Sequence, residues 1–332
     1  MDDGRPGEFE LIRRYFAPLA KDPGSLGLTD DAAVLTPRPG VDLVLTKDML
    51  AADVHFFADD APEAIAAKAL RVNLSDLAAK GARPRGYLMG LALPADWTEG
   101  WVARFCNGLA ADQQAYGVHL LGGDTIRSSN GLQVSITAIG EVDTGKAVRR
   151  SGARPGDILF VSGTIGDAAA GLHARLDPDF SRVHDLTQDE ERHILNRYLL
   201  PRPRTGLAGP VTGFATAAMD ISDGLIADSA HMARASGVGL SIDLSKVPLS
   251  GALQRLKMNA RHEFMRCFNG GDDYEILASV SKDKAAAFQK AAAAAGCPVT
   301  EVGLVEEGSG TVRLHDAGQS LDLSTGGGFR HF

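Results

Sequence analysis

Residues 219–236 read MDISDGLIADSAHMARAS, and their pattern decides the class of fold. Small and apolar residues lead into Asp220, Ser222 and Asp223, and a glycine and an Ala-rich apolar segment follow. This order predicts a buried strand, a tight turn and a helix, as in an α/β protein. It also places two carboxylates at a buried strand end, where each makes ionisation of the other more costly. A helix cap by Ser222 or Asp223 accounts for one of these acids and not for both.

The same alternation of strand and helix patterns continues in both directions along the chain. One helix is predicted over residues 62–80, with Pro62 in its first turn and Gly81 after it, and another over 98–116, closed by Gly117. The strands predicted in the first half cover residues 41–49, 87–94, 118–125 and 132–142. The second half contains a strand–glycine turn–helix pattern at 157–172, strands at 239–244 and 298–305, an acidic turn and strand at 270–280, and an Ala-rich helix at 282–296.

A stretch rich in Gly, Pro and Arg, RSGARPGD at residues 150–157, predicts a crossing between two domains. We therefore expect an N-terminal domain over residues 1–148 and a C-terminal domain over residues 149–332, both of the α/β (α+β) class. Each has the size of an ordinary domain.

Composition excludes several classes of protein. The content of 44% hydrophobic and 23% charged residues is typical of a globular protein, and no stretch approaches the roughly 18 apolar residues of a membrane span. The charged N-terminus has no apolar signal core, and three scattered cysteines argue against a disulfide framework and a Cys zinc site, so we expect a cytoplasmic protein. The net charge of −8 and the lack of a long basic run argue against nucleic acid as a partner.

Acidic residues recur at predicted turns and strand ends. They are Asp30 and Asp31, Asp48, Asp124, Asp220 and Asp223, and Asp272 and Asp273. On the predicted helix 62–80, Asn73, Asp76 and Lys80 form one polar stripe among apolar residues, which indicates contact with a site rather than with bulk water. Hard divalent cations prefer carboxylate oxygens, and Mg²⁺ typically takes one or two of them plus substrate phosphates. The acids therefore predict a Mg²⁺-dependent protein that handles phosphate.

The anionic substrate expected beside Mg²⁺ is a nucleotide, yet the common nucleotide motifs are absent from the sequence. It has no G-x-x-x-x-G-K-[ST] and no G-x-G-x-x-G after a strand. Paired glycines instead precede acids, at 122–124 and 270–272, where a backbone without side chains can approach a phosphate closely. Arg150 could clamp a phosphate, although a single exposed Arg is more often without such a role.

An ordered set of motifs resembles the thiamine-monophosphate kinase family. The motifs are GEFELIRRYF, TDDAAVL, TKDMLAADVHF, KALRVNLSDLAAKGA, LLGGDT, RSGARPGD, MDISDGLIAD, GGDDYEIL and the closing GGFRHF. This family is part of the superfamily of aminoimidazole ribonucleotide synthetase and selenophosphate synthetase. The resemblance implies an N-terminal domain with a mixed sheet and helices that binds ATP and Mg²⁺ and forms a homodimer through its sheet. It implies a C-terminal α/β domain that completes the active site, and transfer of the γ-phosphoryl group of ATP to thiamine monophosphate, which gives thiamine diphosphate.

The resemblance also assigns roles to residues. It implies that Mg²⁺ is bound by Asp31, Thr46, Asp48, Asp76, Asp124, Asp220 and Asp223, of which Asp48, Asp124 and Asp223 are the expected catalytic residues. It implies ATP contacts at Gly123, Asp124, Arg150 and Ser222. It implies thiamine monophosphate contacts at His55, Asp272 and Phe329. From the residues alone, a single His is more often structural, and Phe329 could be plain core.

Three positions depart from the family pattern. Thr29 stands where a Gly usually precedes the paired Asp residues, so the turn can differ. Lys47 replaces a Ser or Thr, and because an ammonium cannot ligate a cation, either one metal is lost or Lys47 contacts a phosphate. Asp272 replaces a Glu and is one methylene shorter.

Two alternatives stay open. One is another ATP-using member of the superfamily, of the aminoimidazole ribonucleotide synthetase type. A selenophosphate synthetase is less consistent, because no cysteine lies before residue 106. The other alternative is a non-catalytic protein that binds a nucleotide or Mg²⁺ on the same fold.

Overall fold

The computed structural model describes residues 5–321 and divides the chain into two units. The N-terminal unit comprises Met1–Leu77 and Ala82–Gly145, and the C-terminal unit comprises Ala78–Gly81 and Lys146–Phe332. Phe329 and the closing GGFRHF motif lie outside the described residues. Across residues 5–321, each helix is too short or too polar to pass through a bilayer.

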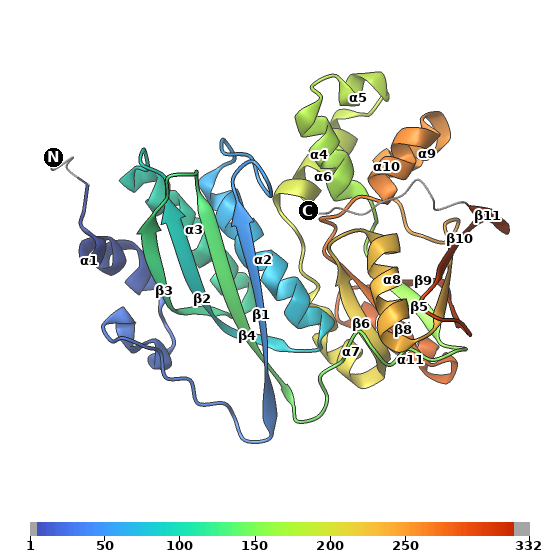
Figure 1. The fold of residues 1–332 in the computed structure, drawn as a ribbon, viewed down its shortest axis with the longest axis horizontal. Coiled ribbons are helices and arrows are strands. Elements are labelled where there is room, and N and C mark those ends of the chain that lie inside the picture. Colours follow the sequence, from blue (N-terminus) through green and yellow to red (C-terminus); the bar gives the residue numbers. More distant parts are fainter. Residues whose placement is uncertain (1–4, 322–332) are drawn as a thin grey trace. The chain divides into compact units, whose positions relative to one another are not determined.

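The N-terminal unit is built on a four-stranded mixed sheet, as expected. Its strand order is β1-β4-β2-β3, in which β2 and β3 run parallel and the other neighbours are antiparallel. The strands are β1 (Val41–Ala51), β2 (Arg83–Leu93), β3 (His119–Arg127) and β4 (Gln133–Asp143). The two long helices α2 (Pro62–Ala79) and α3 (Glu99–Tyr116) lie on one face of this sheet (Figure 1).

The other face of this sheet carries exposed apolar side chains. Alternate residues of a strand share a face, and in β1 the odd-numbered ones are the exposed set. The exposed apolar residues of the sheet are Leu43, Leu45, Met49, Leu88 and Ile126. We call this surface the open sheet face.

Short N-terminal segments lie beside β3, at one edge of the sheet (Figure 1). They are α1 (Glu8–Leu11), the π-helical turn η1 (Ile12–Phe16), and the 3₁₀ turns η2 (Ala17–Leu19) and η3 (Pro23–Leu28). Leu26 and Leu28 of η3 both have positive φ, so the backbone bends sharply just before Thr29. Thr29 itself has φ −108° and donates through Oγ1 to the carbonyl of Leu26, 2.8 Å away.

The C-terminal unit contains a seven-stranded sheet of order β11-β10-β7-β9-β5-β8-β6. Only β10 and β7 pair in parallel in this described sheet. Its strands are β5 (Ile158–Ser162), β6 (Ala215–Ile221), β7 (Gly239–Asp243), β8 (Glu275–Val280), β9 (Val299–Glu306), β10 (Val312–Asp316) and β11 (Gln319–Leu321). Every residue of β5 and β8 is buried, because helices cover both faces of the sheet there.

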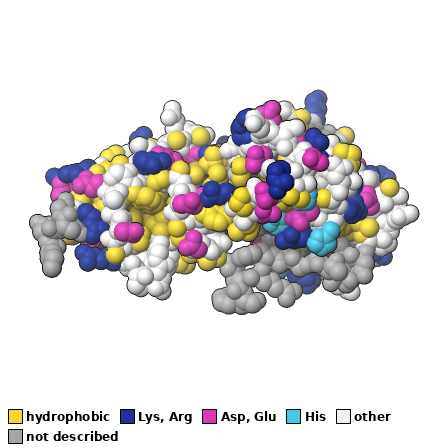
Figure 2. Space-filling model, turned by 90° about the horizontal axis from the view of Figure 1, so that it is seen from above, with side chains coloured by type: hydrophobic (Ala, Val, Ile, Leu, Met, Phe, Trp, Pro, Cys, Tyr) yellow, Lys and Arg dark blue, Asp and Glu magenta, His cyan; other side chains and the backbone are white. Residues whose placement is uncertain are grey.

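Helices form two layers around this sheet. On one side the apolar core includes α4 (Asp167–Leu176), α8 (Leu225–Ser236), α9 (Gly251–Asn259) and α10 (Arg261–Phe268). On the other side it includes α7 (Ala208–Phe214) and α11 (Ala285–Ala294). The remaining elements are α5 (Phe180–Val183), α6 (Gln188–Leu199), η4 (Thr205–Leu207) and η5 (Lys282–Lys284). Figure 2 shows histidine side chains on this unit and hydrophobic side chains between charged ones on the N-terminal unit.

Local chemistry explains the helix ends that the sequence predicts. The Thr98 side chain accepts a hydrogen bond from the N–H of Trp101 and so begins α3, and Gly117 ends it in the left-handed conformation. The observed strand, turn and helix around residue 222 match the opening prediction, with β6 ending at Ile221 and α8 beginning at Leu225.

Candidate functional site

The first group of predicted ligands lies where β1 faces α2. Thr46 and Asp48 point to the same side of β1, because they are two residues apart on a strand. Thr46 donates through Oγ1 to the carboxylate of Asp76 on α2. The N–H of Asp48 donates to Oδ1 of the fully buried Asn73, 3.1 Å away. At Asn73 and Asp76, the predicted polar stripe therefore contacts a strand rather than bulk water.

The charges of this group favour a cation. Burial, and then the charge of Asp76, raise the pKa of Asp48 to about 6. Two carboxylates that oppose each other's ionisation are relieved by a bound divalent cation, and Thr46 adds a hydroxyl oxygen. The donor set is all oxygen, which suits Mg²⁺. We call Thr46, Asp48 and Asp76 the β1–α2 group.

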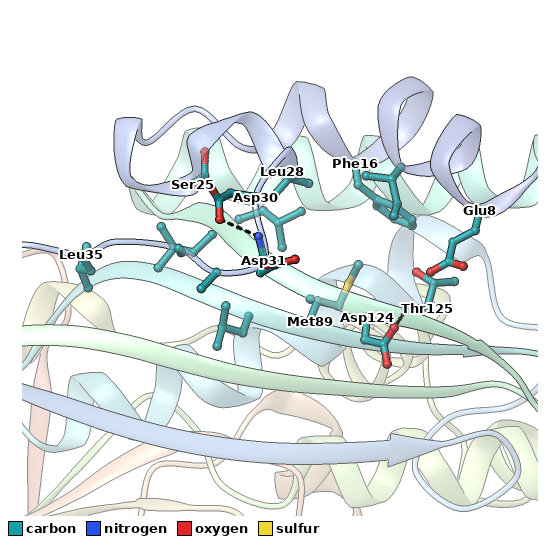
Figure 3. A pocket seen from close by; sticks show the side chains of 18 of the residues that line it. Glu8, Phe16, Ser25, Leu28, Asp30, Asp31, Leu35, Met89, Asp124 and Thr125 are labelled. Atoms are coloured by element: carbon teal, nitrogen blue, oxygen red, sulfur yellow. Dashed lines mark hydrogen bonds between the residues drawn. The ribbon is translucent and has the colours of Figure 1, made fainter.

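A second group lies at the β3 edge of the same unit. Asp31, Gly123 and Asp124 line a pocket of about 600 Å³ between the N-terminal segments and the sheet, and Figure 3 shows the two acids among its lining residues. Both acids are exposed. The pocket is otherwise largely apolar, with Phe9, Ile12, Phe16, Leu28, Leu35, Leu88 and Leu120 among its lining. We call Asp31 and Asp124 the β3-edge group.

The sheet keeps these two groups apart within one chain. β1 and β3 are opposite edge strands, so their axes lie about 14 Å apart at the usual strand spacing. The groups also point to opposite faces. Asp124 lies on the open sheet face: its partner in β2 is Gly90, which in turn pairs with Ser135 of β4 on that face. Asp48 lies on the opposite face, toward α2. Thus the predicted ligands of the N-terminal unit form two half-sites.

Lys47 does not enter the β1–α2 group. Its side chain lies on the open sheet face, opposite to Asp48, and Nζ donates to Oγ of Ser135. The ammonium is therefore directed away from the carboxylates of Asp48 and Asp76. This Lys leaves the oxygen set of the β1–α2 group intact.

His55 lies in the turn that follows β1. Its Nδ1 accepts a hydrogen bond from the N–H of Ala51 at 3.1 Å, which sets the orientation of the ring. Lys68 donates to the His55 carbonyl at 2.8 Å. These contacts show a structural role for His55, and its predicted contact with thiamine monophosphate stays a prediction.

In the C-terminal unit, Asp228 organises the turn between β6 and α8. Its carboxylate accepts from the N–H groups of Ser222, at 3.0 Å, and Asp223, at 2.9 Å. Within the described chain no side chain caps α8, whose N-cap is Gly224, so the capping interpretation of Ser222 or Asp223 is wrong. Asp228 was missed from the sequence because its contact depends on the shape of the turn. Its place six residues after Ser222, in the motif MDISDGLIAD, was the available signal.

This turn gathers charge around Asp223. Burial raises the pKa of Asp228 to about 7, the charge of Asp223 adds to this rise, and Arg150 opposes it. Asp223, Asp228 and His231 place ligand atoms within 4.8 Å of one another. Asp220 is buried on β6, opposite Ile276 of β8. The structure therefore places Arg150, Ser222 and Asp223 around Asp228, and their roles toward ATP and Mg²⁺ stay predictions.

The acidic loop at residues 270–274 packs directly on this turn. The N–H of Asp272 donates to the carbonyl of Ser222 at 2.8 Å, and the N–H of Tyr274 donates to that of Ile221 at 2.8 Å. A Cβ on Gly271 would lie 2.2 Å from the Ser222 carbonyl oxygen, so the close approach requires glycine. Loop packing therefore requires a glycine at position 271, and the predicted close approach of a phosphate to this backbone stays a prediction.

Strain is stored in the same loop. Asp272 and Tyr274 have φ of +70° and +50°, in the left-handed region that non-glycine residues rarely adopt. Asp273 lies between them, is fully buried, and accepts from the N–H of Gly166 at 2.7 Å. Burial raises the pKa of Asp273 to about 8, against the lowering effect of Arg197.

Two arginines bind this loop and the first residue of the strand that follows it. Arg197 of α6 donates to the carbonyl of Asp273 and to the carboxylate of Glu275, each at 2.8 Å. Arg204 binds Glu275 with two nitrogens, and Ser162 donates to it at 2.6 Å. The sequence carried no signal for this network, since its members come from separate elements. It fixes the loop that presents Asp272.

Two family models and a curated relative match most of the chain. Residues 29–142 match the family model of the AIR synthase related protein, N-terminal domain, and residues 154–315 match that of the C-terminal domain. The chain is 46% identical over 309 residues to a thiamine-monophosphate kinase of Caulobacter vibrioides, covering 92% of this chain and 86% of the relative.

Solved structures show the same likeness. A thiamine-monophosphate kinase from Stenotrophomonas maltophilia K279a superposes with a TM-score of 0.82 at 37% identity, covering 95% of this chain and 98% of that one. AaThiL complexed with AMPPCP and TMP superposes with a TM-score of 0.76 at 34% identity, covering 98% of this chain and 97% of that one.

Proposed function

The chain belongs to the thiamine-monophosphate kinase family, and from this premise we propose that it phosphorylates thiamine monophosphate with ATP, yielding thiamine diphosphate and ADP. The likeness to AaThiL complexed with AMPPCP and TMP, over 98% of this chain, is the observation that carries the proposal. It makes the chain an enzyme of thiamine biosynthesis, a transferase with a phosphate group as acceptor. We place it in the cytoplasm, which the free cysteines at 106, 267 and 297 favour.

The acceptor determines what chemistry the protein must supply. A phosphate monoester has its second pKa near about 6, so an acceptor oxygen is already nucleophilic at neutral pH. That oxygen attacks the γ-phosphorus, and the bond from the γ-phosphorus to the β–γ bridging oxygen breaks as ADP leaves. No strong general base is needed, and we propose direct transfer without a phosphoenzyme. The main obstacle is repulsion between two polyanions.

The acidic groups are suited to Mg²⁺. When bound, Mg²⁺ neutralises phosphate charge and holds donor and acceptor in line. In the N-terminal unit, the β1–α2 group and the β3-edge group would hold it. In the C-terminal unit, Asp220 and Asp223 would do so, while Ser222 and Arg150 bind ATP phosphates. Burial, with a neighbouring carboxylate (Asp76 for Asp48, Asp223 for Asp228), raises the pKa of each of these two carboxyl groups, which supports this fit.

Substrate contacts remain as the resemblance implies. We propose that His55, Asp272 and Phe329 contact thiamine monophosphate. The strained loop supports a role for Asp272, because strain of this kind persists mainly where function requires a fixed geometry. Gly123 precedes Asp124 on β3 and lines the same pocket, and we propose that its backbone contacts ATP.

We propose that two copies pair through the open sheet face. Its exposed apolar residues, such as Leu45 at 62% and Met49 at 57% exposure, are typical of an interaction surface. Because the β3-edge group lies on this face and the β1–α2 group faces α2, we propose that the half-sites meet where edge strand β3 of one copy lies along edge strand β1 of its partner. The N-terminal domain, residues 1–148, then binds ATP and Mg²⁺ and dimerises, and residues 149–332 complete the active site.

A coupled assay of ADP release tests this function against its alternatives. With ATP and Mg²⁺ present, ADP should appear only after thiamine monophosphate is added. A non-catalytic nucleotide-binding protein would bind an ATP analogue and never release ADP. ADP release that does not depend on thiamine monophosphate, but does depend on another acceptor, would favour another activity of the superfamily.

A further inference from the structure

Three ligands of different chemistry meet between α4 and α10, next to the start of the acidic loop, where the carbonyl of Cys267 accepts from the N–H of Gly270 at 3.0 Å. His173 comes from α4, and Glu263 and Cys267 lie four residues apart on α10, on one face of that helix. Nδ1 of His173 is 2.7 Å from Oε1 of Glu263 and 3.5 Å from Sγ of Cys267. Ligand atoms of all three lie within 4.8 Å of one another. We call them the α4–α10 cluster.

We propose that the α4–α10 cluster binds one Zn²⁺ ion, with water as the fourth ligand. A thiolate and an imidazole favour Zn²⁺ over Mg²⁺ or Ca²⁺, and three protein ligands plus water is an established zinc arrangement. This proposal does not depend on the kinase activity.

The distances need only small adjustments. Zn–N and Zn–O bonds of about 2.0–2.1 Å and a Zn–S bond of about 2.3 Å place tetrahedral ligand atoms roughly 3.3–3.8 Å apart. The Nδ1–Sγ distance of 3.5 Å already falls in this range. The Nδ1–Oε1 distance of 2.7 Å would lengthen by about half an ångström as the ion replaces the hydrogen bond. The third separation, between Sγ of Cys267 and a carboxylate oxygen of Glu263, is at most 4.8 Å and would shorten by about 1 Å or less.

Neighbouring groups support this geometry. Nη1 of Arg266 donates to the second oxygen of Glu263 at 2.9 Å, which leaves Oε1 directed at His173. Such outer contacts orient metal ligands. The positive charge of Arg266 opposes a cation, so we expect weaker binding than at a four-ligand structural site. Side-chain exposures of 20% for His173 and 13% for Glu263 leave a path for the ion.

Zn²⁺ binding at the α4–α10 cluster requires the loss of one proton. Burial lowers the pKa of His173, so the ring is neutral near pH 7 and can offer Nδ1 with its proton on Nε2. Burial raises the pKa of the Cys267 thiol, so the thiol is protonated without metal. Ligation converts it to a thiolate. One proton per Zn²⁺ is therefore released, and it comes from Cys267.

The test uses the full-length protein, freed of metal with a chelator. Co²⁺, which absorbs light when thiolate-bound, is titrated first, because the carboxylate sites described above cannot give a thiolate-to-metal band. The wild type should show this band at one equivalent, and Zn²⁺ should remove it. Calorimetry in two buffers should give about one proton released per Zn²⁺.

Matched variants locate the ion. Cys267→Ser should abolish the band. His173→Gln and Glu263→Gln, at two partly exposed side chains, should each weaken Zn²⁺ binding about tenfold or more. Cys106→Ser, at another buried cysteine, should leave the band unchanged. Melting temperatures of the metal-free variants show whether each is folded. The proposal is overturned if the wild type gives no thiolate band, or if folded His173→Gln and Glu263→Gln bind Zn²⁺ as the wild type does.

Discussion

Replacing Asp273 by Asn should change how stability depends on pH. Asp273 is fully buried in the strained loop, and Asn keeps its shape and an oxygen that can accept from the N–H of Gly166, now 2.7 Å from the carboxylate. The substitution removes only the ionisable carboxyl group at position 273. Because Asn does not ionise, the variant isolates the effect of this single carboxyl group.

The size and sign follow from linkage. The pKa of Asp273 is about 8 in the folded chain and 3.8 in its unperturbed state. Between these values the folded chain holds one proton more than the unfolded chain, so stability is greatest below the lower value and is lost as pH rises. One proton corresponds to about 1.4 kcal/mol per pH unit. From pH 5.5 to 7.5, Asp273→Asn should therefore gain about 2–3 kcal/mol relative to the wild type.

Urea denaturation followed by circular dichroism at the two pH values measures this difference. The exposed Asp143, at the end of β4, provides the control: Asp143→Asn should follow the wild type at both pH values. If the stability difference between Asp273→Asn and the wild type is the same at pH 5.5 and 7.5, Asp273 is ionised in the folded chain. The argument that burial outweighs Arg197 would then be refuted.

Three further predictions concern the proposed reaction. In a steady-state assay, Asp48→Asn and Asp124→Asn should each lower kcat about 100-fold or more. The control variant Asp143→Asn should leave kcat nearly unchanged. Equal losses of kcat in all three variants would contradict the assigned half-sites. Leu45→Asp, on the open sheet face, should shift the mass measured by light scattering from dimer to monomer and remove activity, and an unchanged mass would exclude this face as the interface. Incubation with radiolabelled ATP alone should leave the protein unlabelled, whereas a labelled aspartate would show a phosphoenzyme.

Local signals in the sequence predicted much of the fold. Pro62 and Gly117 mark helix ends where the structure has them, and the apolar runs at β5 and β8 become fully buried strands. Periodicity and capping act over a few residues, so a single sequence shows them. The pair α9 and α10 and the hairpin of β10 and β11 were not predicted.

The arrangement of the site depended on contacts that no local pattern contains. The family resemblance predicts Asp48 and Asp124 as ligands, but only the strand order shows that they lie at opposite edges of one sheet. Asp228 was overlooked because its role depends on turn geometry. Lys47 suggests the loss of a metal when it is considered only as the neighbour of Asp48 in the sequence. Alternation along β1 directs its side chain to the other face of the sheet.

The most direct test of the central claim is product formation. The purified protein is mixed with ATP, Mg²⁺ and thiamine monophosphate, and thiamine diphosphate is sought by chromatography, with EDTA added to a parallel sample. The account predicts thiamine diphosphate in the first sample and none with EDTA. Absence of thiamine diphosphate from a folded protein that still binds ATP and Mg²⁺ would contradict the proposed function.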